Sequence, residues 1–539
     1  MLPFFAGGGV TGANWFTRAR LVLSEFGRLG MRHVPDAPAL PVRDPWPGDP
    51  AHGARIMRGE FDHLGGARPI KSGGWNDDTG SLLLRSALHG FTWLRDLRAL
   101  GSDGARARAR ALVQDWINAP ARDPVADHPD VVGARIWAWL AHYDFFAASA
   151  DDQYRQRLMG RLLGDARALA VAIPVEENDG RALSAIKGLI AAASAIPEHD
   201  ALMVRALKFL PAEISRQVLA DGMHCERSPA AHLGALQCLI EIRALLQAAQ
   251  SPAVPSLASA IERMSAALRL LRHGDGSLAL FNGTAEIAPN LIELVLTQAG
   301  RAGRVPGVLE EGGFSRLQAG RTLLIADTGA PPPAGMDRFA HAGTLSFELS
   351  LGRERLIVNC GALPGASSAW RDALRATAAH STLVVADTNS SEVNENGLGR
   401  RVGNVEISRQ EANGALWLDV SQDGWSRNLG IMHHRRMYLS ADGDDLRGED
   451  LLEGDAPYGS VVRFHLHPNV QASVQQDGEA VLLRLPLGSF WRLRADGGVV
   501  GLEESIYFGG SEPRRSEQVT ITIASDGPQM AKWAISRLA

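Results

Sequence analysis

Side chains that can move protons or bind anions are concentrated between Asp221 and His232, where the chain reads Asp-Gly-Met-His-Cys-Glu-Arg-Ser-Pro-Ala-Ala-His. His224 and His232 carry imidazoles, which gain and lose a proton near neutral pH. Arg227 could bind a carboxylate through paired hydrogen bonds, and Glu226 could contact a substrate beside it. The Ser-Pro pair predicts a helix start, which favours anions. The segment is therefore a candidate catalytic site, and a capped surface loop is the alternative.

A second group of such residues lies in the C-terminal half, and it consists of His341, Asn359, Arg371, Arg375 and His380. If the strands that carry the two histidines are neighbours, their imidazoles meet, and the asparagine could add an oxygen ligand. Two imidazoles and an oxygen ligand are compatible with zinc. The two arginines could contact an acidic substrate. For each histidine alone, a structural position in the core or on the surface is the alternative.

Three further sets of residues could contact a ligand. Arg463, His465 and His467 alternate along a predicted strand and would therefore share one of its faces. The run from His433 to Arg436 has similar residue types with less regularity. An exposed polar sheet face is the alternative for both sets. Trp75 could stack on a sugar ring, although a tryptophan on a helix more often lies in the core.

The first cluster lies in a part of the chain with helical periodicity. From about Trp75 to His273, apolar residues recur every three or four positions, which places them on single helix faces. Helix breakers divide this stretch, among them Pro120, Pro197, Pro211 and Pro252. We expect about eight to ten helices with short connections, and therefore antiparallel neighbours.

The second cluster lies where the period falls to two. Thr344 to Ser350 and Gln518 to Ile523 alternate apolar and polar residues, and other short strand candidates lie between them with turn signals. Many short strands without interleaved helices favour an antiparallel sandwich. We therefore predict a multidomain chain, α then β, with a helical domain over residues 1–310 and a β-sandwich over residues 311–539.

Composition excludes several classes of protein. The chain has 539 residues and a net charge of -5, from 55 basic and 60 acidic residues, which argues against a nucleic-acid-binding protein. Three cysteines form no disulfide framework and match no zinc spacing. No apolar stretch has the length of a transmembrane helix. The N-terminal segment has its first basic residue at Arg18, the wrong order for a secretory signal, so the sequence alone predicts the cytoplasm.

Several segments together resemble the heparinase II/III-like family. In the C-terminal half they are His341 to Ser350, Leu356 to Gly361, Trp370 to Leu383, Gly448 to Asp450, Arg463 to Pro468 and Glu503 to Tyr507. Upstream, Leu88 to Leu94 and the cluster from Asp221 to His232 are also similar to the family. The resemblance extends from about Asp44 to Leu538.

This resemblance implies an incomplete (α/α) toroid followed by an antiparallel β-sandwich, and it implies a polysaccharide lyase. Such an enzyme neutralises the carboxylate of a uronate, removes the α-proton with a base and protonates the departing oxygen with an acid. The resemblance also implies a structural zinc in the sandwich, with His341 and His380 as ligands and Asn359 in place of the family's aspartate. It further implies a location in the cell envelope or periplasm.

The sequence departs from the family's pattern at three places. Ala231 stands where active members carry the tyrosine that serves as acid and base. Phe339 stands where they carry an additional histidine, and the segment from Gly180 to Leu183 has no match for the asparagine that binds the carboxylate. The resemblance therefore indicates the fold more strongly than it indicates the mechanism.

The leading hypothesis is a polysaccharide lyase that cleaves an acidic, uronate-containing glycan. His224, His232 and His341 would be its catalytic residues with Arg227 as carboxylate clamp. Substrate would contact Glu226, Trp75, Arg371, Arg375 and His465. One alternative is a glycan-binding or scaffold protein of the envelope that has lost catalysis. Another is a glycoside hydrolase that pairs Glu226 with Asp275 or Asp221. The expected partner is an acidic polysaccharide or oligosaccharide, and the sequence does not determine the oligomeric state.

Overall fold

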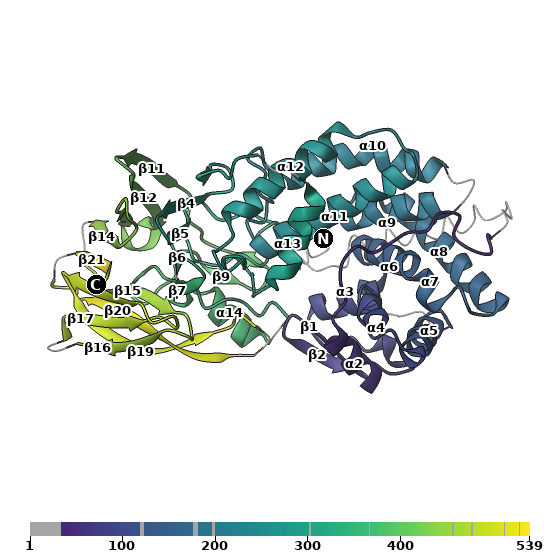
Figure 1. The fold of residues 1–539 in the computed structure, drawn as a ribbon, viewed down its shortest axis with the longest axis horizontal. Coiled ribbons are helices and arrows are strands. Elements are labelled where there is room, and N and C mark those ends of the chain that lie inside the picture. Colours follow the sequence, from purple (N-terminus) through teal and green to yellow (C-terminus); the bar gives the residue numbers. More distant parts are fainter. Residues whose placement is uncertain are drawn as a thin grey trace, which may run out of the picture.

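The computed structural model describes residues 34–538 except 119–122, 176–181, 197–199, 301–302, 366, 455–456, 476–477, 511 and 528. Helices occupy one end of the long axis and strands the other (Figure 1). The predicted fold class is confirmed, because a helical N-terminal half is followed by antiparallel sheets. In the described ranges, no helix combines the length and apolar character needed to cross a membrane.

The helical half is a curved array of antiparallel helices with a short hairpin of β1 (Glu60–His63) and β2 (Gly66–Pro69). Its helices are α2 (Pro50–Arg58), α3 (Leu82–Gly90), α4 (Leu94–Ala99), α5 (Asp103–Asn118), α6 (Pro129–Ala141), α7 (Tyr143–Phe146), α8 (Asp152–Ala172), α9 (Ala182–Ala195), α10 (Asp200–Gln217), α11 (Pro229–Ala248), α12 (Pro255–Leu270) and α13 (Pro289–Ala299).

Small residues let the central helices approach closely. A Cβ on Gly133 of α6 would lie 2.3 Å from the carbonyl oxygen of Ser184, and one on Gly188 of α9 would lie 2.4 Å from the Cα of Gly133. The two helix backbones are therefore in contact, and any larger side chain at either glycine would push them apart. The alanine-rich end of α9, from Ala191 to Ala195, is largely buried in the same core.

One predicted helix boundary is wrong. Pro211 was expected to separate two helices, but α10 continues through it. Proline removes the backbone donor that would bond to the preceding turn, which weakens a helix interior. Here Leu210 and Ile214 on either side of the proline are buried in the core. The packing of this apolar face holds the helix together across the missing hydrogen bond. The prolines at 120 and 197 lie outside the described residues.

The strand half consists of two large antiparallel sheets. In the described residues, one sheet has the order β19-β20-β15-β7-β6-β5-β4-β3 with β8 paired to β15, and the other has the order β11-β12-β13-β14-β21-β18-β17-β16.

The strands of the first sheet are β3 (Val308–Leu309), β4 (Phe314–Ala319), β5 (Thr322–Asp327), β6 (Phe347–Leu351), β7 (Glu354–Val358), β8 (Leu383–Val385), β15 (Ser460–Leu466), β19 (Val499–Tyr507) and β20 (Arg514–Ile523). Those of the second are β11 (Val405–Ala412), β12 (Ala415–Trp425), β13 (Ile431–Leu439), β14 (Asp445–Gly454), β16 (Gln471–Val474), β17 (Ala480–Arg484), β18 (Phe490–Asp496) and β21 (Met530–Arg537). Outside the two sheets lie the pair β9 (Val393–Asn394) and β10 (Gly397–Leu398), and the helices α14 (Ser368–Arg375) and α15 (Ser426–Leu429).

The first sheet is buried on both faces where it meets the helices. In β5, Leu323 and Ile325 belong to the core of the helical half, whereas Leu324 and Ala326 belong to the core between the sheets. Successive side chains of a strand point to opposite faces, so this strand separates the two cores. The sandwich therefore rests its first sheet against the helices, and the second sheet lies on the far side.

Candidate functional site

His224 and His232 lie together at the start of α11, and hydrogen bonds occupy all four of their ring nitrogens. Nε2 of His224 donates to Oε1 of Gln217 (3.1 Å), and its Nδ1 accepts from the N–H of Glu226 (3.3 Å). Nε2 of His232 donates to the carbonyl of Met264 (2.9 Å), and its Nδ1 accepts from the N–H of His224 (3.2 Å). Each nitrogen has a fixed role, so each ring is held as one neutral tautomer.

Burial reinforces this neutral state. Both rings are removed from water, and burial lowers the pKa of His224 to about 3 and that of His232 to about 4. A protonated imidazole carries a second N–H, which would meet a backbone N–H at Nδ1. Neither histidine could accept a proton without losing a bond that holds the loop. The two rings are neighbours, as the sequence spacing predicted, and each of their nitrogens bonds to another group of the protein.

The side chain of Arg227 crosses to the strand half, where its partners belong to the protein itself. Its backbone is left-handed, with φ of 51°, which directs the side chain from the start of α11 towards β4 and β5. Its guanidinium donates to the carbonyls of Gly312 (2.7 Å), Gly313 (2.9 Å), Gly329 (3.3 Å) and Ala330 (2.6 Å) and to the carboxylate of Asp327. Because these bonds occupy all five N–H groups, none is left to bind a uronate.

Asn282, which the sequence analysis did not single out, joins the first predicted cluster to the second. Its Nδ2 donates to the carbonyl of Arg227 (3.0 Å), and its Oδ1 accepts from the N–H of His341 (3.1 Å). The next residue, Gly283, donates its N–H to Nε2 of His341 (2.9 Å). The Asn-Gly pair is a turn signal in the sequence, but its position between two domains is a tertiary feature.

His341 and His380 do meet, as the sequence predicted, but they bond directly to each other. Nδ1 of His341 donates to Nε2 of His380 (3.0 Å), and Nδ1 of His380 donates to the carbonyl of Ala376 (2.8 Å). With Gly283 on the remaining nitrogen of His341, these bonds leave neither ring a free nitrogen. Burial lowers the pKa of His380 to about 4 and that of His341 well below its usual range.

This arrangement does not fit the zinc that the family resemblance implies. Oδ1 of Asn359 accepts from the N–H of Ser381 (3.0 Å), and its Nδ2 donates to Glu348. A zinc ligand must direct a free lone pair at the metal, and here the lone pairs accept hydrogen bonds. Within the residues that the structure describes, no group of three or more His, Cys, Asp or Glu side chains could hold a metal ion.

Arg371 and Arg375 lie on α14 and differ in their surroundings. Arg375 is buried and donates to the carbonyls of Ala340 (2.9 Å), Asn394 (2.7 Å) and Gly397 (2.8 Å). Arg371 is half-buried and bonds to Asp372 (3.2 Å). Both line a cavity beside His341 of about 10 Å³, which is the size of one water molecule and too small for a sugar.

Two other candidate residues serve the packing of their own domains. His465 bonds to Ser505 (2.8 Å) and to the carbonyl of Ala378 (3.0 Å), and burial lowers its pKa to about 3. Trp75 is 2% exposed, stacks on Phe91 and donates its indole N–H to Asp115 (2.7 Å). The geometry thus presents neither side chain to a ligand.

The carboxylates considered for a hydrolase also have partners of their own. Asp221 accepts from the N–H groups of Met223 (3.0 Å) and Gly312 (2.7 Å), and Asp275 pairs with Arg355 (3.0 Å). Both belong to the contact between the two halves. The region matched to the family's asparagine begins at Gly180 and Arg181, which lie outside the described residues.

A second polar network, centred on Glu348, completes the contact between the domains. Its carboxylate is fully buried and accepts from Nε2 of His273 (2.9 Å) and from the N–H groups of Leu280 (3.1 Å) and Asn359 (3.0 Å). Burial raises the pKa of Glu348, but the hydrogen bond and charge of His273, together with Arg355 and the N–H of Asn359, hold it below its usual value. Together with the Arg227 contacts and the Asp275–Arg355 pair, this network forms what we call the interdomain seam.

Part of the cationic run at residues 433–436 is buried inside the sandwich. Arg435 is fully buried and forms a two-point contact with Asp450 (2.7 and 3.1 Å), which also accepts from His433 (2.8 Å) and Trp533 (2.9 Å). The sequence made this run a candidate for contact with a ligand. His433 and Arg435 instead bond to a carboxylate inside the sandwich, whereas His434 and Arg436 pair with Glu453 and Glu449 nearer the surface.

The chain matches the sequence models "Heparinase II/III N-terminus" over residues 129–299 and "Heparinase II/III-like, C-terminal" over residues 301–534. It is 34% identical over 510 residues to FtsZ-localized protein C of Caulobacter vibrioides (strain NA1000 / CB15N), covering 90% of this chain and 88% of that protein.

Solved structures share the fold at low sequence identity. Heparinase III is 15% identical, with a TM-score of 0.72, over 97% of this chain and 89% of that one. A mutant of the heparan sulfate lyase HepC from Pedobacter heparinus is 16% identical, with a TM-score of 0.62, over 98% of this chain and 89% of that one. With two sequence models that cover most of its length and a toroid followed by a β-sandwich, the chain belongs to the heparinase II/III-like family.

Proposed function

We propose that this protein is a non-catalytic member of its family and works as a scaffold by binding other molecules. One observation carries the proposal: the four histidines at the expected site, His224, His232, His341 and His380, are neutral, buried and hydrogen-bonded at every ring nitrogen. A general base needs an available lone pair within reach of the substrate proton. Ala231, in place of the family's tyrosine, supplies no hydroxyl to act instead.

The 34% identical relative supports a site of action for this scaffold. That protein is named for its localisation with FtsZ, and the similarity extends over 90% of the present chain. We propose that this protein also localises with FtsZ. Of the two locations considered from the sequence, this favours the cytoplasm over the envelope or periplasm.

An activity assay tests the loss of catalysis. The full-length protein would be incubated with a panel of uronate glycans that includes heparan sulfate, alginate and polygalacturonate, and ultraviolet absorbance would be followed. β-Elimination creates an unsaturated uronate that absorbs, so the proposal predicts no gain above the blank. Heparinase III on heparan sulfate is the positive control. A steady gain in absorbance would restore the lyase hypothesis, and new reducing ends without absorbance would favour the hydrolase.

Localisation is tested separately. A fluorescent fusion of this protein should form a band that coincides with labelled FtsZ in dividing cells and that disperses when FtsZ is depleted. Purified protein should sediment with FtsZ polymers and remain in the supernatant without them. Uniform fluorescence in cells that have an FtsZ band, or no co-sedimentation, would contradict the proposed role at FtsZ.

A further inference from the structure

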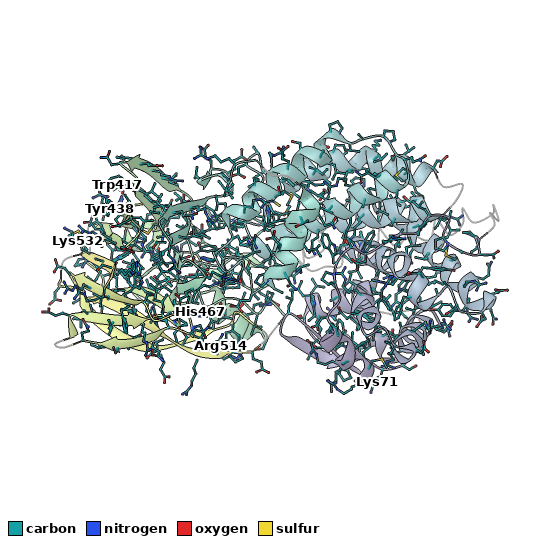
Figure 2. All side chains as sticks on the ribbon, viewed as in Figure 1. Lys71, Trp417, Tyr438, His467, Arg514 and Lys532 are labelled. Atoms are coloured by element: carbon teal, nitrogen blue, oxygen red, sulfur yellow. The ribbon has the colours of Figure 1, made fainter. Side chains whose placement is uncertain are left out.

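The outer face of the second sheet carries an open groove at the end of the molecule opposite the helices. Figure 2 labels Trp417, Tyr438 and Lys532 there. The groove has a volume of about 790 Å³ and crosses β12, β13, β14, β21 and β18. Five neighbouring strands span roughly 19 Å at about 4.8 Å each, so the groove is long enough for an extended ligand. We call it the outer groove.

One row of side chains across the groove begins with two aromatic rings. Trp417 of β12 is paired with Tyr438 of β13, and their ring centroids are 5.1 Å apart. Both side chains are half-exposed. In the described part of the chain, neither the indole N–H nor the phenol O–H has a hydrogen-bond partner. Aromatic side chains with one apolar face and one free polar atom are typical of binding surfaces.

The same row continues into a shallow floor with a cation on each side. Tyr438 is paired with Arg447 of β14, and the next two positions are Ala534 of β21 and Arg494 of β18. The alanine and the neighbouring Ser536 are small, which lowers the floor between the two arginines. Arg494 is exposed and has no ion-pair partner among the described residues, so its donors are available to a ligand.

A second row alternates in charge. Asp419, Arg436, Glu449, Lys532 and Asp496 follow one another across the five strands. Nitrogen and oxygen lie 3.3 Å apart in the Arg436–Glu449 pair and 3.8 Å apart in the Lys532–Glu449 pair. The groove as a whole is lined by four cationic and four carboxylate side chains. It therefore has no net charge with which to attract a polyanion.

This composition selects one kind of ligand. A neutral sugar chain has apolar C–H faces that stack on aromatic rings, and hydroxyls that both donate to carboxylates and accept from arginine and lysine. An acidic polymer would meet as much repulsion as attraction, and a purely apolar partner would leave the charged groups without water. We propose that the outer groove binds a neutral oligosaccharide, with Trp417 and Tyr438 as its stacking platform. This site is separate from the seam and independent of the proposed role at FtsZ.

The test measures binding by the full-length protein with isothermal titration calorimetry. Cellohexaose, maltohexaose and chitohexaose are the neutral probes, and the hexamer of galacturonate is the acidic one. At least one neutral hexamer should bind, with an affinity that changes less than about twofold when the ionic strength rises from about 0.1 M to about 1 M. Trp417→Ala and Tyr438→Ala should each weaken that affinity about tenfold or more.

Trp370→Ala is the matched control, because Trp370 is 45% exposed and lies on α14, away from the outer groove. It should bind the neutral hexamer as the unaltered protein does, and circular dichroism should show that all three variants are folded. The proposal fails if no neutral hexamer binds at millimolar concentration. It also fails if Trp417→Ala and Tyr438→Ala leave the affinity unchanged, or if the galacturonate hexamer binds more tightly than every neutral one.

Discussion

The interdomain seam and the outer groove both contain arginines and carboxylates, but those of the seam are buried and those of the groove lie at the surface. In the seam, arginine, histidine and glutamate are buried, and Arg227 and Glu348 each bond to several partners across the domains. In the outer groove, Trp417 and Arg494 keep unpaired donors facing water. Buried polar groups whose hydrogen bonds are satisfied within the protein stabilise the fold. Exposed polar groups without a protein partner can form hydrogen bonds to a ligand. This contrast predicts that the two regions respond very differently to perturbation.

Acid should produce the largest effect, through the buried histidines. The pKa values of His224, His232, His380 and His465 lie at about 3 to 4 in the folded protein, below the ordinary 6.5. Below pH 6.5 the unfolded chain therefore binds more protons, so stability is present above that pH and is lost as pH falls. At pH 5 each ring should cost about 2 kcal/mol of unfolding free energy. Urea unfolding at pH 7.5, 6 and 5 measures this loss of unfolding free energy. A free energy of unfolding that does not change over this pH range would contradict the burial of these histidines in the neutral form.

Removing the arginine of the seam should have the next largest effect. Arg227→Ala leaves four carbonyls and the buried carboxylate of Asp327 without their donor. We expect a loss of about 3 to 5 kcal/mol in unfolding free energy, as for other broken buried ion pairs. Arg227→Lys should recover only part of it because lysine has three donors in another geometry. A melting temperature equal to that of the unaltered protein would mean that the seam contributes little.

A milder change tests the other half of the seam. Glu348→Gln keeps the shape of the side chain but removes the charge, and it places an NH2 group among donors from His273, Leu280 and Asn359. We expect about 1 to 3 kcal/mol of destabilisation in urea at pH 7.5. The difference from the unaltered protein should shrink as pH falls below about 4.5, since the lowered pKa of Glu348 stabilises the fold only while the carboxylate is charged. A difference in unfolding free energy that grows as the pH falls would contradict the stabilising role of the charged Glu348 carboxylate.

Substitutions in the outer groove should barely affect stability. Trp417→Ala and Arg494→Ala each remove a side chain that is at least partly exposed and has no hydrogen-bond partner in the described residues. We expect changes within about 0.5 kcal/mol in the same urea assay, as for other surface positions. A loss of several kcal/mol would show that these side chains hold the sheet together and would remove the contrast with the seam.

Chelation should have the smallest effect. Because His341 and His380 bond to each other and Asn359 accepts from Ser381, we expect no stoichiometric zinc in the purified protein. EDTA should leave the melting temperature unchanged, whereas loss of a structural zinc would lower it. Elemental analysis by mass spectrometry gives the metal content directly, and one zinc per chain would require a rearrangement of the histidine pair.

Local patterns predicted the architecture well because periodicity reports which face of an element is buried. The alternation of Thr344 to Ser350 placed Phe347 and Leu349 on the core side and Glu348 and Ser350 on the other, as observed. The strand itself begins later, at Phe347, since Leu345 has a left-handed φ of 65°. What alternation could not reveal is that the polar face meets another domain instead of water.

The candidate site shows the same limit. Residue types and spacing identified His224 and His232, and residue types together with the family resemblance identified His341 and His380; both pairs are neighbours in the structure. Apart from the side chain of Gln217, seven residues before His224, their hydrogen-bond partners are distant in sequence or belong to the backbone, as with Met264 and Gly283, and no motif encodes those. Trp417 and Tyr438 were missed, although their outward positions on alternating strands are a signal that could have singled them out.

The sequence by itself determined that a helical domain precedes a β-sandwich, since hydrophobic periods and turn residues act locally along the chain. It also determined which titratable residues gather near the start of α11 and in the sandwich. Only the tertiary structure decided whether those groups have hydrogen-bond partners within the protein or remain available to a ligand. That property depends on burial and on partners from other elements, such as the carbonyls around Arg227 and the strands that align Trp417 with Tyr438.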